Sequence, residues 1–293
     1  MSDFLTQRAN LSGKVAVVLG GAGGIGAAIS LALANAGVNV AVCDIDSAAV
    51  AAMLAEQRAM GRAEFGRVID VTQPAALANF YAEVAASFAR LDIVVNVVGG
   101  VRQRSFMDAT EGQCAADVQR NYGYVLDSVR HAVPLIRRGA CGGSIVNFTT
   151  IEASRGAAGF AVYAGAKAAV ANFSRALAVE LAAERIRVNC VAPDTTPSRG
   201  NTNGLPPEMA AAIARMPDKM AEALKMYIPM GSPPEAADLA DAVLFLASDL
   251  SRMITGTSLH VDGGTWAASG FINWPFGGGY LPVPPPVTLE RML

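Results

Sequence analysis

Residues 15 to 43 contain no charged side chain, and this stretch constrains the fold more than any other feature. On length alone, such a run could cross a membrane. Six of its residues are glycine and two are asparagine, however, and two short β-branched segments flank an Ala- and Leu-rich segment. This order predicts a strand at Val15 to Leu19, a glycine-rich turn, a helix over 25 to 36 and a strand at Val38 to Cys43, rather than a membrane span.

The same alternation continues through most of the chain. Further strands are predicted at 63 to 68, 93 to 98, 144 to 148, 187 to 191 and 258 to 261, and helices near 47 to 60, 74 to 90, 112 to 137, 161 to 183 and 235 to 247. Strands that alternate with helices call for a parallel sheet covered on both faces, with right-handed crossovers. We therefore expect a single α/β domain over residues 1–264, built on a Rossmann-like, doubly wound parallel sheet.

Two segments depart from this alternation. Residues 194 to 233 carry six prolines, preceded by Pro193, around a helical piece rich in methionine, namely Met209, Met216, Met220 and Met226. An insertion after a strand lies where ligands bind in open α/β sheets, so it is either a substrate lid or a packing appendage. Beyond it, residues 265–293 form a C-terminal extension rich in Gly, Pro and aromatic residues, for which we expect irregular structure packed on its own site or on a neighbouring subunit.

Composition excludes several classes of function. The chain has 23 Lys and Arg against 25 Asp and Glu, without a basic run, which argues against nucleic-acid binding. Its four cysteines and two histidines show no metal-type spacing, so no metal is expected. With only 16% charged and 52% hydrophobic residues, a large apolar surface is implied, and we expect a homo-oligomer. No signal peptide is recognised at the N-terminus, and reduced cysteines fit a cytoplasmic protein.

The glycine-rich turn is the first candidate binding site. In L-G-G-A-G-G-I-G at 19 to 26, Gly20, Gly24 and Gly26 follow a strand and open a helix. Glycine lets the backbone approach a pyrophosphate closely, and a helix N-terminus offers free N–H groups to it. A glycine-rich turn can also serve packing alone.

Two aspartates follow the next two strands. Asp44 stands 18 residues after Gly26 and can bond both ribose hydroxyls of an adenosine while repelling a 2′-phosphate, which favours NAD over NADP. Asp44 could instead be a turn residue or a helix cap. Asp70, followed by Val71, either reaches the adenine amino group or caps the next helix.

Tyr163 and Lys167 lie four residues apart on one predicted helix and therefore share a face. A tyrosine with an ordinary pKa near 10 acts as a base near neutral pH only if positive charge stabilises its phenolate, and Lys167 could supply that charge. An exposed helix face is the alternative for such a pair.

Several motifs together are similar to those of the short-chain dehydrogenase/reductase family, over residues 12 to 264. They are the glycine turn, N-V-V-G at 96 to 99, Asn121 in R-N-Y-G, S-I-V-N-F-T-T at 144 to 150, Y-A-G-A-K at 163 to 167, I-R-V-N-C-V-A-P at 186 to 193, and the segments F-L-A-S-D, I-T-G and V-D-G-G within 245 to 264. The resemblance implies a dimer or tetramer that binds a nicotinamide dinucleotide and exchanges hydride with an alcohol carbon. It implies that Tyr163 is the acid/base, that Lys167 lowers its pKa and holds the nicotinamide ribose, and that Asn121 anchors a water. The implied cofactor contacts also include Ile25, Val71, Asn96, Gly99 and Pro193.

The chain departs from the family pattern at four positions. Leu19 replaces the usual threonine before the first glycine, and Val97 replaces an asparagine. The substrate-orienting serine lies 13 residues before the tyrosine in the family, and Thr150 occupies that position here, with Thr149 and Ser154 as alternatives. Asp194 replaces a glycine after Pro193; it could contact substrate, bond into the lid or cap it.

These features predict an NAD-dependent oxidoreductase that interconverts a secondary alcohol and a ketone, with Tyr163, Lys167, Thr150 and Asn121 as catalytic residues. The Met-rich lid and aromatic tail suggest a bulky apolar substrate, such as an alicyclic, terpenoid, aromatic or steroid-like alcohol. An NADP-linked 3-oxoacyl carrier-protein reductase and a non-catalytic NAD-binding sensor are the alternatives. Enoyl reductases of the superfamily space their Tyr and Lys more widely.

Overall fold

Seven parallel strands form the central sheet of the computed structural model, which describes residues 4–100, 102–197, 211, 215–275 and 279–292. Their order across the sheet is β3-β2-β1-β4-β5-β6-β7. The chain winds outward from β1 to β3 and then returns to start again at β4, which confirms the doubly wound topology. The strands are β1 (Val15–Leu19), β2 (Asn39–Asp44), β3 (Phe65–Val68), β4 (Ile93–Asn96), β5 (Gly143–Phe148), β6 (Ile186–Pro193) and β7 (Ser258–Val261). In such sheets, ligands bind outside the carboxyl ends of the strands at the point where the winding reverses, here between β1 and β4.

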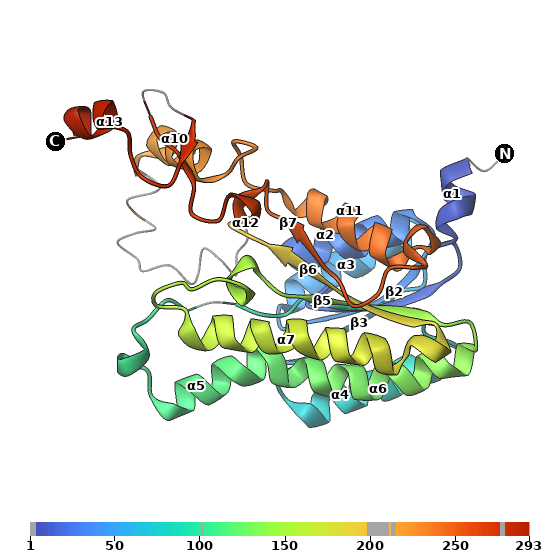
Figure 1. The fold of residues 1–293 in the computed structure, drawn as a ribbon. Coiled ribbons are helices and arrows are strands. Elements are labelled where there is room, and N and C mark those ends of the chain that lie inside the picture. Colours follow the sequence, from blue (N-terminus) through green and yellow to red (C-terminus); the bar gives the residue numbers. More distant parts are fainter. Residues whose placement is uncertain (1–3, 101, 198–210, 212–214, 276–278, 293) are drawn as a thin grey trace.

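Helices cover both faces of the sheet (Figure 1). One layer holds α2 (Gly24–Asn35), α3 (Ser47–Ala59) and α11 (Ala236–Ala247), and the other holds α4 (Pro74–Ser87), α6 (Tyr124–Gly139) and α7 (Ala161–Glu180). Along β1, Val15, Val17 and Leu19 join the core under α4, α6 and α7, whereas Ala16 and Val18 join the core under α2 and α11. A strand buried on both faces has no place for charge, which explains the charge-free run. No helix among the described residues is long and apolar enough to cross a membrane.

The predicted helix over 112 to 137 is interrupted. It consists of α5 (Glu111–Val118), a wide π-helical turn at Gln119–Gly123, and α6. Such single π turns occur often at functional sites because they rotate the following side chains relative to a regular helix. Here the turn contains Asn121, whose side chain is fully buried.

The lid and the tail lie together at one end of the molecule, opposite the N-terminal helix α1 (Phe4–Ala9) (Figure 1). The described part of the lid forms α10 (Pro217–Tyr227), while Met209 lies outside the described residues. The tail is more regular than its composition suggests. It forms α12 (Thr265–Ala268), a small hairpin of β8 (Ile272–Asn273) and β9 (Tyr280–Leu281), and α13 (Pro286–Met292). Because β8 lies against α10, the tail packs on the lid of its own chain.

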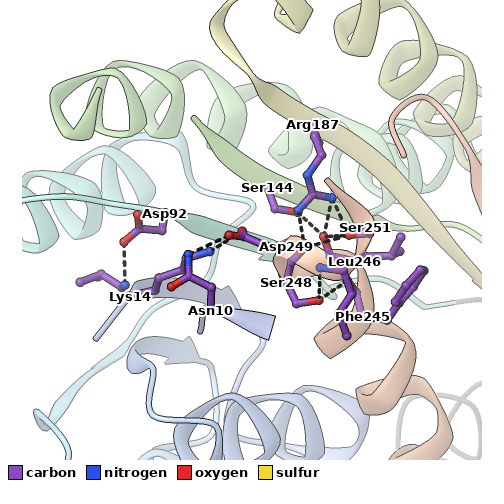
Figure 2. A network of polar contacts seen from close by, with 12 residues as sticks. Asn10, Lys14, Asp92, Ser144, Arg187, Phe245, Leu246, Ser248, Asp249 and Ser251 are labelled. Atoms are coloured by element: carbon purple, nitrogen blue, oxygen red, sulfur yellow. Dashed lines mark hydrogen bonds and ion pairs between the residues drawn. The ribbon is translucent and has the colours of Figure 1, made fainter. Parts of the chain in front are cut away.

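The amino-terminal edge of the sheet is closed by a polar network (Figure 2). Arg187, near the start of β6, donates hydrogen bonds to the carbonyls of Leu246 and Ser248 and to the Ser251 hydroxyl, at distances of 2.7, 3.2 and 2.9 Å. Ser144, near the start of β5, donates to the same Leu246 carbonyl at 2.8 Å. These bonds satisfy the carbonyls that α11 leaves free at its C-terminal end. The network anchors α11 at the amino-terminal edge of the sheet and does not involve the carboxyl ends of the strands.

Candidate functional site

The glycine turn between β1 and α2 leaves no room for side chains at two of its positions. Gly20 has a φ of +81°, and a Cβ atom at Gly26 would lie 1.9 Å from the Gly20 carbonyl oxygen. Both positions therefore require glycine. The N-cap of α2 is Gly23, which provides no side-chain cap, so the first-turn amides of Gly24, Ile25 and Gly26 are not covered by a capping side chain. This backbone can hold an anionic group such as a pyrophosphate.

Asp44 ends β2 beside this turn. Its carboxylate accepts hydrogen bonds from the backbone N–H groups of Ala22, at 3.3 Å, and Ile45, at 2.8 Å. A Cβ atom at Gly23 would lie 3.8 Å from the same carboxylate. Among the described residues, no Lys or Arg forms an ion pair with Asp44. The negative charge thus remains next to the glycine turn, where the sequence predicted an adenosine ribose.

Asp70 and Asn96 use their side chains within the protein. The exposed Asp70 accepts hydrogen bonds from the Thr72 N–H and hydroxyl, at 2.9 and 2.7 Å, in the turn before α4, while Val71 is buried. Asp70 thus stabilises this turn but does not cap α4, whose N-cap is Gln73, and its contact with an adenine stays a prediction. The Asn96 side chain donates to Asn147 and accepts from Ser128, both at 2.7 Å, and is fully buried. The Asn96 amide thus joins β4, β5 and α6, and its contact with a cofactor stays a prediction.

Lys167, Asn121 and Gly99 meet at the carboxyl edge of β4 and β5. The Lys167 ammonium is buried and donates to the Phe148 carbonyl oxygen at 2.8 Å. A Cβ atom at Gly99 would lie 2.9 Å from Lys167 Nζ and 3.0 Å from Asn121 Oδ1. The Asn121 side chain is itself fixed by the Gly100 N–H, at 3.0 Å, and by the Gly100 carbonyl, at 3.1 Å. Burial lowers the pKa of Lys167 to about 8.

Tyr163 lies one helical turn before Lys167 on α7, and the Thr150 hydroxyl is close enough to lower its pKa. Burial raises the pKa of Tyr163 well above its ordinary value. Thr150 lowers this pKa by less, and the carboxylates of Glu152 and Asp194 make smaller contributions that raise it. The expectation that the protein's own charges lower this pKa through Lys167 is therefore wrong. Desolvation of the phenolate and two nearby negative charges outweigh the stabilising contacts.

The alternatives for the hydroxyl beside Tyr163 are resolved by their contacts. Thr150 precedes the short turn Ile151–Ala153 after β5 and is the hydroxyl that acts on the Tyr163 pKa, whereas the Thr149 hydroxyl donates to the Val191 carbonyl at 3.3 Å. Ser154 is exposed beyond the turn. Of the three, Thr150 is the hydroxyl close to Tyr163.

Three polar residues near Tyr163 were not predicted, and they explain Asp194. Thr150 donates a short hydrogen bond to Glu152, and Arg155 donates to Glu152 at 2.7 Å and to the Tyr227 hydroxyl. Tyr227, the last residue of α10, donates in turn to Asp194 at 2.7 Å. Asp194, which follows the half-buried Pro193 at the end of β6, therefore bonds into the lid. The spacing E-x-x-R was the only sequence signal for this cluster, and it did not reveal the lid partner.

A small hollow of about 20 Å³ lies beside Tyr163. Phe106 and Phe160 contribute apolar walls, and Arg102 and Arg104 contribute two guanidinium groups. Arg104 is paired with Asp117 at 3.0 Å. Among the described residues, no group of three or more His, Cys, Asp or Glu side chains could hold a metal ion.

Comparisons with known proteins agree with this geometry. A family model described as Enoyl-(Acyl carrier protein) reductase matches residues 20–265. An uncharacterized oxidoreductase of Mycobacterium tuberculosis is 35% identical over 254 residues, which cover 87% of this chain and 92% of the relative. The 3-oxoacyl-acyl-carrier-protein reductase of Chlamydia trachomatis is 33% identical, covering 87% of this chain and 98% of its own length.

Solved structures share the fold over almost their whole length. Carveol dehydrogenase from Mycobacterium avium, in complex with NAD, superimposes with a TM-score of 0.78 at 28% identity, covering 88% of this chain and 99% of the other. A 7α-hydroxysteroid dehydrogenase complexed with NADH and 7-oxo glycochenodeoxycholic acid gives a TM-score of 0.80 at 26% identity, covering 90% and 98%. The chain is an oxidoreductase by this relationship, and it belongs to the short-chain dehydrogenase/reductase family.

Proposed function

We propose that this protein is an NAD-dependent dehydrogenase that interconverts a secondary alcohol and a ketone, with Tyr163 as the acid/base. The observation that carries the proposal is the meeting of Tyr163, Thr150 and Lys167 at the carboxyl edge of the sheet, beside the uncapped glycine turn. A proton-transferring hydroxyl and a dinucleotide-binding backbone thus lie on the same edge. Relatives whose names are those of dehydrogenases and reductases support the same class of reaction.

The residues present fit a nicotinamide dinucleotide. The first-turn amides of α2 would hold its pyrophosphate, Asp44 its adenosine ribose, and Lys167 its second ribose, and Gly99 would leave space beside Lys167. The bound group supplies or accepts the hydride. Two structural neighbours with NAD bound support this choice of cofactor.

The chemistry of the chain's own residues is proton transfer at the Tyr163 hydroxyl. Because its pKa is raised, the phenol is protonated at neutral pH and can donate to a developing alkoxide during ketone reduction. Alcohol oxidation runs through the same atom in reverse. The Lys167 ammonium, near its pKa at neutral to mildly basic pH, places positive charge next to the ribose-binding position. The Thr150 hydroxyl lies close enough to Tyr163 to lower its pKa.

Replacement of the proposed acid/base tests this function. Tyr163→Phe is expected to lower kcat by a factor of about 10²–10⁴, since it removes acid–base catalysis, while the Kd for NAD stays close to that of the wild type. Tyr280→Phe is the matched control, because the Tyr280 hydroxyl lies in the tail and has no hydrogen-bond partner among the described residues. Retention of most activity by Tyr163→Phe, measured by NADH absorbance, would refute the assignment.

We propose a bulky apolar alcohol as substrate. The lid contributes Met220 and Met226, both half-buried, and the hollow beside Tyr163 has aromatic walls. The named substrates of two neighbours, a carveol and a hydroxysteroid, are alicyclic alcohols. A thermal-shift screen with NAD present should detect such ligands, because a ligand at about 100 times its Kd stabilises a protein by about 2.7 kcal/mol. A response to short polar hydroxy acids alone would overturn this substrate class.

An NADP-linked 3-oxoacyl carrier-protein reductase is the second candidate, favoured by the 33% identical relative of that name. Asp44 discriminates between the two. In the wild type we expect kcat/KM to be higher with NAD than with NADP, and Asp44→Ala to reduce that ratio at least about tenfold, or about 1.4 kcal/mol. A wild-type preference for NADP would favour the reductase.

A sensor without turnover is the third candidate, and it predicts NAD binding with no change in NADH absorbance for any alcohol or ketone.

We further propose that the protein is a cytoplasmic homo-oligomer, a dimer or a tetramer. Several large apolar side chains are exposed in the single chain, among them Val179, Met253 and Met107 at 77%, 87% and 85%. All four cysteines are free, as expected in a reducing compartment. Light scattering should give a mass two or four times the 30.2 kDa of one chain.

A further inference from the structure

The lid helix α10 is fixed to the molecule at its C-terminal end rather than along its length. None of its eleven described residues, Pro217–Tyr227, is buried. Ile228, which follows the helix, is 1% exposed, and a Cβ atom at Gly263 would lie only 2.5 Å from its side chain. The chain stays attached just beyond, since the Met230 N–H donates to the Gly263 carbonyl at 3.0 Å. The segment after α10 is therefore the root of the lid.

Tyr227, the last residue of α10, makes the polar contact between this helix and the sheet. Its hydroxyl donates to the Asp194 carboxylate at 2.7 Å and accepts from the Arg155 guanidinium, which lies 5.6 Å from the centre of the ring. No other side chain of α10 forms a hydrogen bond or an ion pair within the described part of the chain. A single hydroxyl thus provides the polar attachment of the lid helix.

The two partners of Tyr227 belong to firmly placed elements. Asp194 directly follows Pro193, the last paired residue of β6, and its side chain is 10% exposed. Arg155 is paired with Glu152 at 2.7 Å, in the turn after β5 that packs on α7. The carboxyl ends of two neighbouring strands therefore share one hydroxyl of the lid.

A phenol hydroxyl is suited to this position between opposite charges. Arg155 can only donate and an ionised Asp194 can only accept, so the group between them must do both. Hydrogen bonds to charged groups are stronger than those between neutral groups. Asp194 and Glu152 are also close enough to Tyr163 for their charges to act on its pKa. The contact that fixes the lid therefore lies beside the proposed acid/base.

We propose that Tyr227 is a positioning residue that locks α10 over the carboxyl ends of β5 and β6, so that the lid stays closed on a bulky alcohol held at Tyr163. The inference rests on the proposed function and names the residue through which the lid acts on substrate affinity. Opening turns α10 about its root at Ile228 and breaks both hydrogen bonds of the Tyr227 hydroxyl at once. A bulky alcohol, which extends to the lid, depends on this lock more than a small one.

Hydrogen exchange of the α10 amides in the full-length protein measures the lock without turnover. Tyr227→Phe keeps the aromatic ring and removes both hydrogen bonds, so α10 should exchange about tenfold faster, equivalent to about 1.4 kcal/mol. Exchange in α7 and α11 should stay as in the wild type. Glu222→Gln is the matched control, because Glu222 is exposed on the same helix and has no hydrogen bond or ion pair among the described residues. Its exchange should resemble that of the wild type.

A second substitution separates the lock from a general loss of packing. Asp194→Ala removes the acceptor of the Tyr227 proton, so alone it should also speed exchange in α10. In the Tyr227→Phe background it should have little further effect, because both changes break the same contact. Additive effects of the two substitutions would overturn the proposal, and so would a Tyr227→Phe variant that exchanges like the wild type.

Kinetics test the consequence for the substrate, with menthol as the bulky and isopropanol as the small secondary alcohol. Tyr227→Phe should raise the KM for menthol about tenfold and the KM for isopropanol by less than about twofold, with little change in kcat, as expected when binding alone is weakened. The Kd for NAD should not change. Equal rises in both KM values, or none, would count against the lock. Activity in Tyr163→Phe would instead refute the proposed function, and the exchange measurement does not depend on it.

Discussion

Gly99 leaves the space that the Lys167 ammonium occupies. A methyl group there would come within 2.9 Å of Lys167 Nζ, which is the movable end of a flexible side chain. We therefore expect Gly99→Ala to displace the ammonium from the Phe148 carbonyl without unfolding the protein. Activity should fall about a hundredfold, the order expected for a misplacement near 1 Å, with little change in the free energy of unfolding.

Gly100→Ala is the control for this prediction, because a Cβ atom at Gly100 meets nothing within 4 Å. Its activity should resemble that of the wild type. Steady-state kinetics and denaturant unfolding of both variants check the prediction. Equal activities in Gly99→Ala and the wild type would show that the position of Lys167 does not matter for the reaction.

Burial of Lys167 predicts a pH dependence of stability. Its pKa falls from 10.5 to about 8 in the folded protein, so between these values the unfolded chain binds more protons than the folded one. Stability contributed by this group therefore rises with pH across that window. The free energy of unfolding of the wild type, minus that of Lys167→Met, should increase by about 3 kcal/mol from pH 8 to pH 10.5. A difference that stays flat in urea titrations over this range would contradict the burial of a charged ammonium.

At the scale of elements, the strands were the most predictable feature. A strand buried on both faces, such as β1 or β4, leaves a short apolar run between turn signals, and its type and place follow from the run. The interruption between α5 and α6 was not predictable, because Q-R-N-Y-G fits a regular helix locally. Its extra residue is stabilised by distant contacts, since the Asn121 side chain bonds to Gly100, which belongs to another loop.

At the site, too, residues whose contacts are distant in the sequence were not predictable. Family motifs identified Tyr163 and Lys167, and the glycine turn followed from its own spacing. The partners of Asn96 and the cluster of Glu152, Arg155 and Tyr227 did not follow, because they join residues far apart in the sequence. The direction of the Tyr163 pKa depended on the same cluster, since burial and the surrounding carboxylates determine it.

Arg187 offers a stability test for an element junction. Its three hydrogen bonds hold the end of α11 and the following turn against β6 (Figure 2). Arg187→Met removes three sheltered hydrogen bonds, although Ser144 and Ser251 still donate to the Leu246 carbonyl, and should cost about 2–4 kcal/mol in the free energy of unfolding. Arg58→Met, which breaks the exposed ion pair with Glu64, is the control and should change stability little. Similar denaturant midpoints for the two variants would contradict a structural role for the Arg187 network.

At the scale of the whole molecule, the two edges of the sheet have different tasks. The amino-terminal edge is closed by Arg187 and its partners, while the carboxyl edge carries the glycine turn, Asp44, Lys167 and Tyr163. The lid helix α10 stands over the end of β6 and reaches the site through Tyr227. The tail lies against α10 rather than against the sheet (Figure 1). Stability and ligand contact are thus assigned to opposite ends of the strands.

This separation predicts the effect of removing the tail. A chain that ends after Gly270 keeps α12, where Thr265 is buried and Asp262 binds the Trp266 N–H at 2.8 Å, but it loses β8, β9 and α13. The denaturant midpoint and the Kd for NAD should stay near the wild-type values, because the sheet and the glycine turn are untouched. The KM for a bulky alcohol should rise about tenfold, equivalent to about 1.4 kcal/mol, since α10 loses the hairpin that packs on it.

Trp274→Ala removes the hydrogen bond from the indole N–H to the Leu281 carbonyl and should raise the same KM, but by less than the truncation. If truncation instead lowered the denaturant midpoint or weakened NAD binding while leaving the KM for the alcohol unchanged, the tail would belong to the core of the fold and not to the lid.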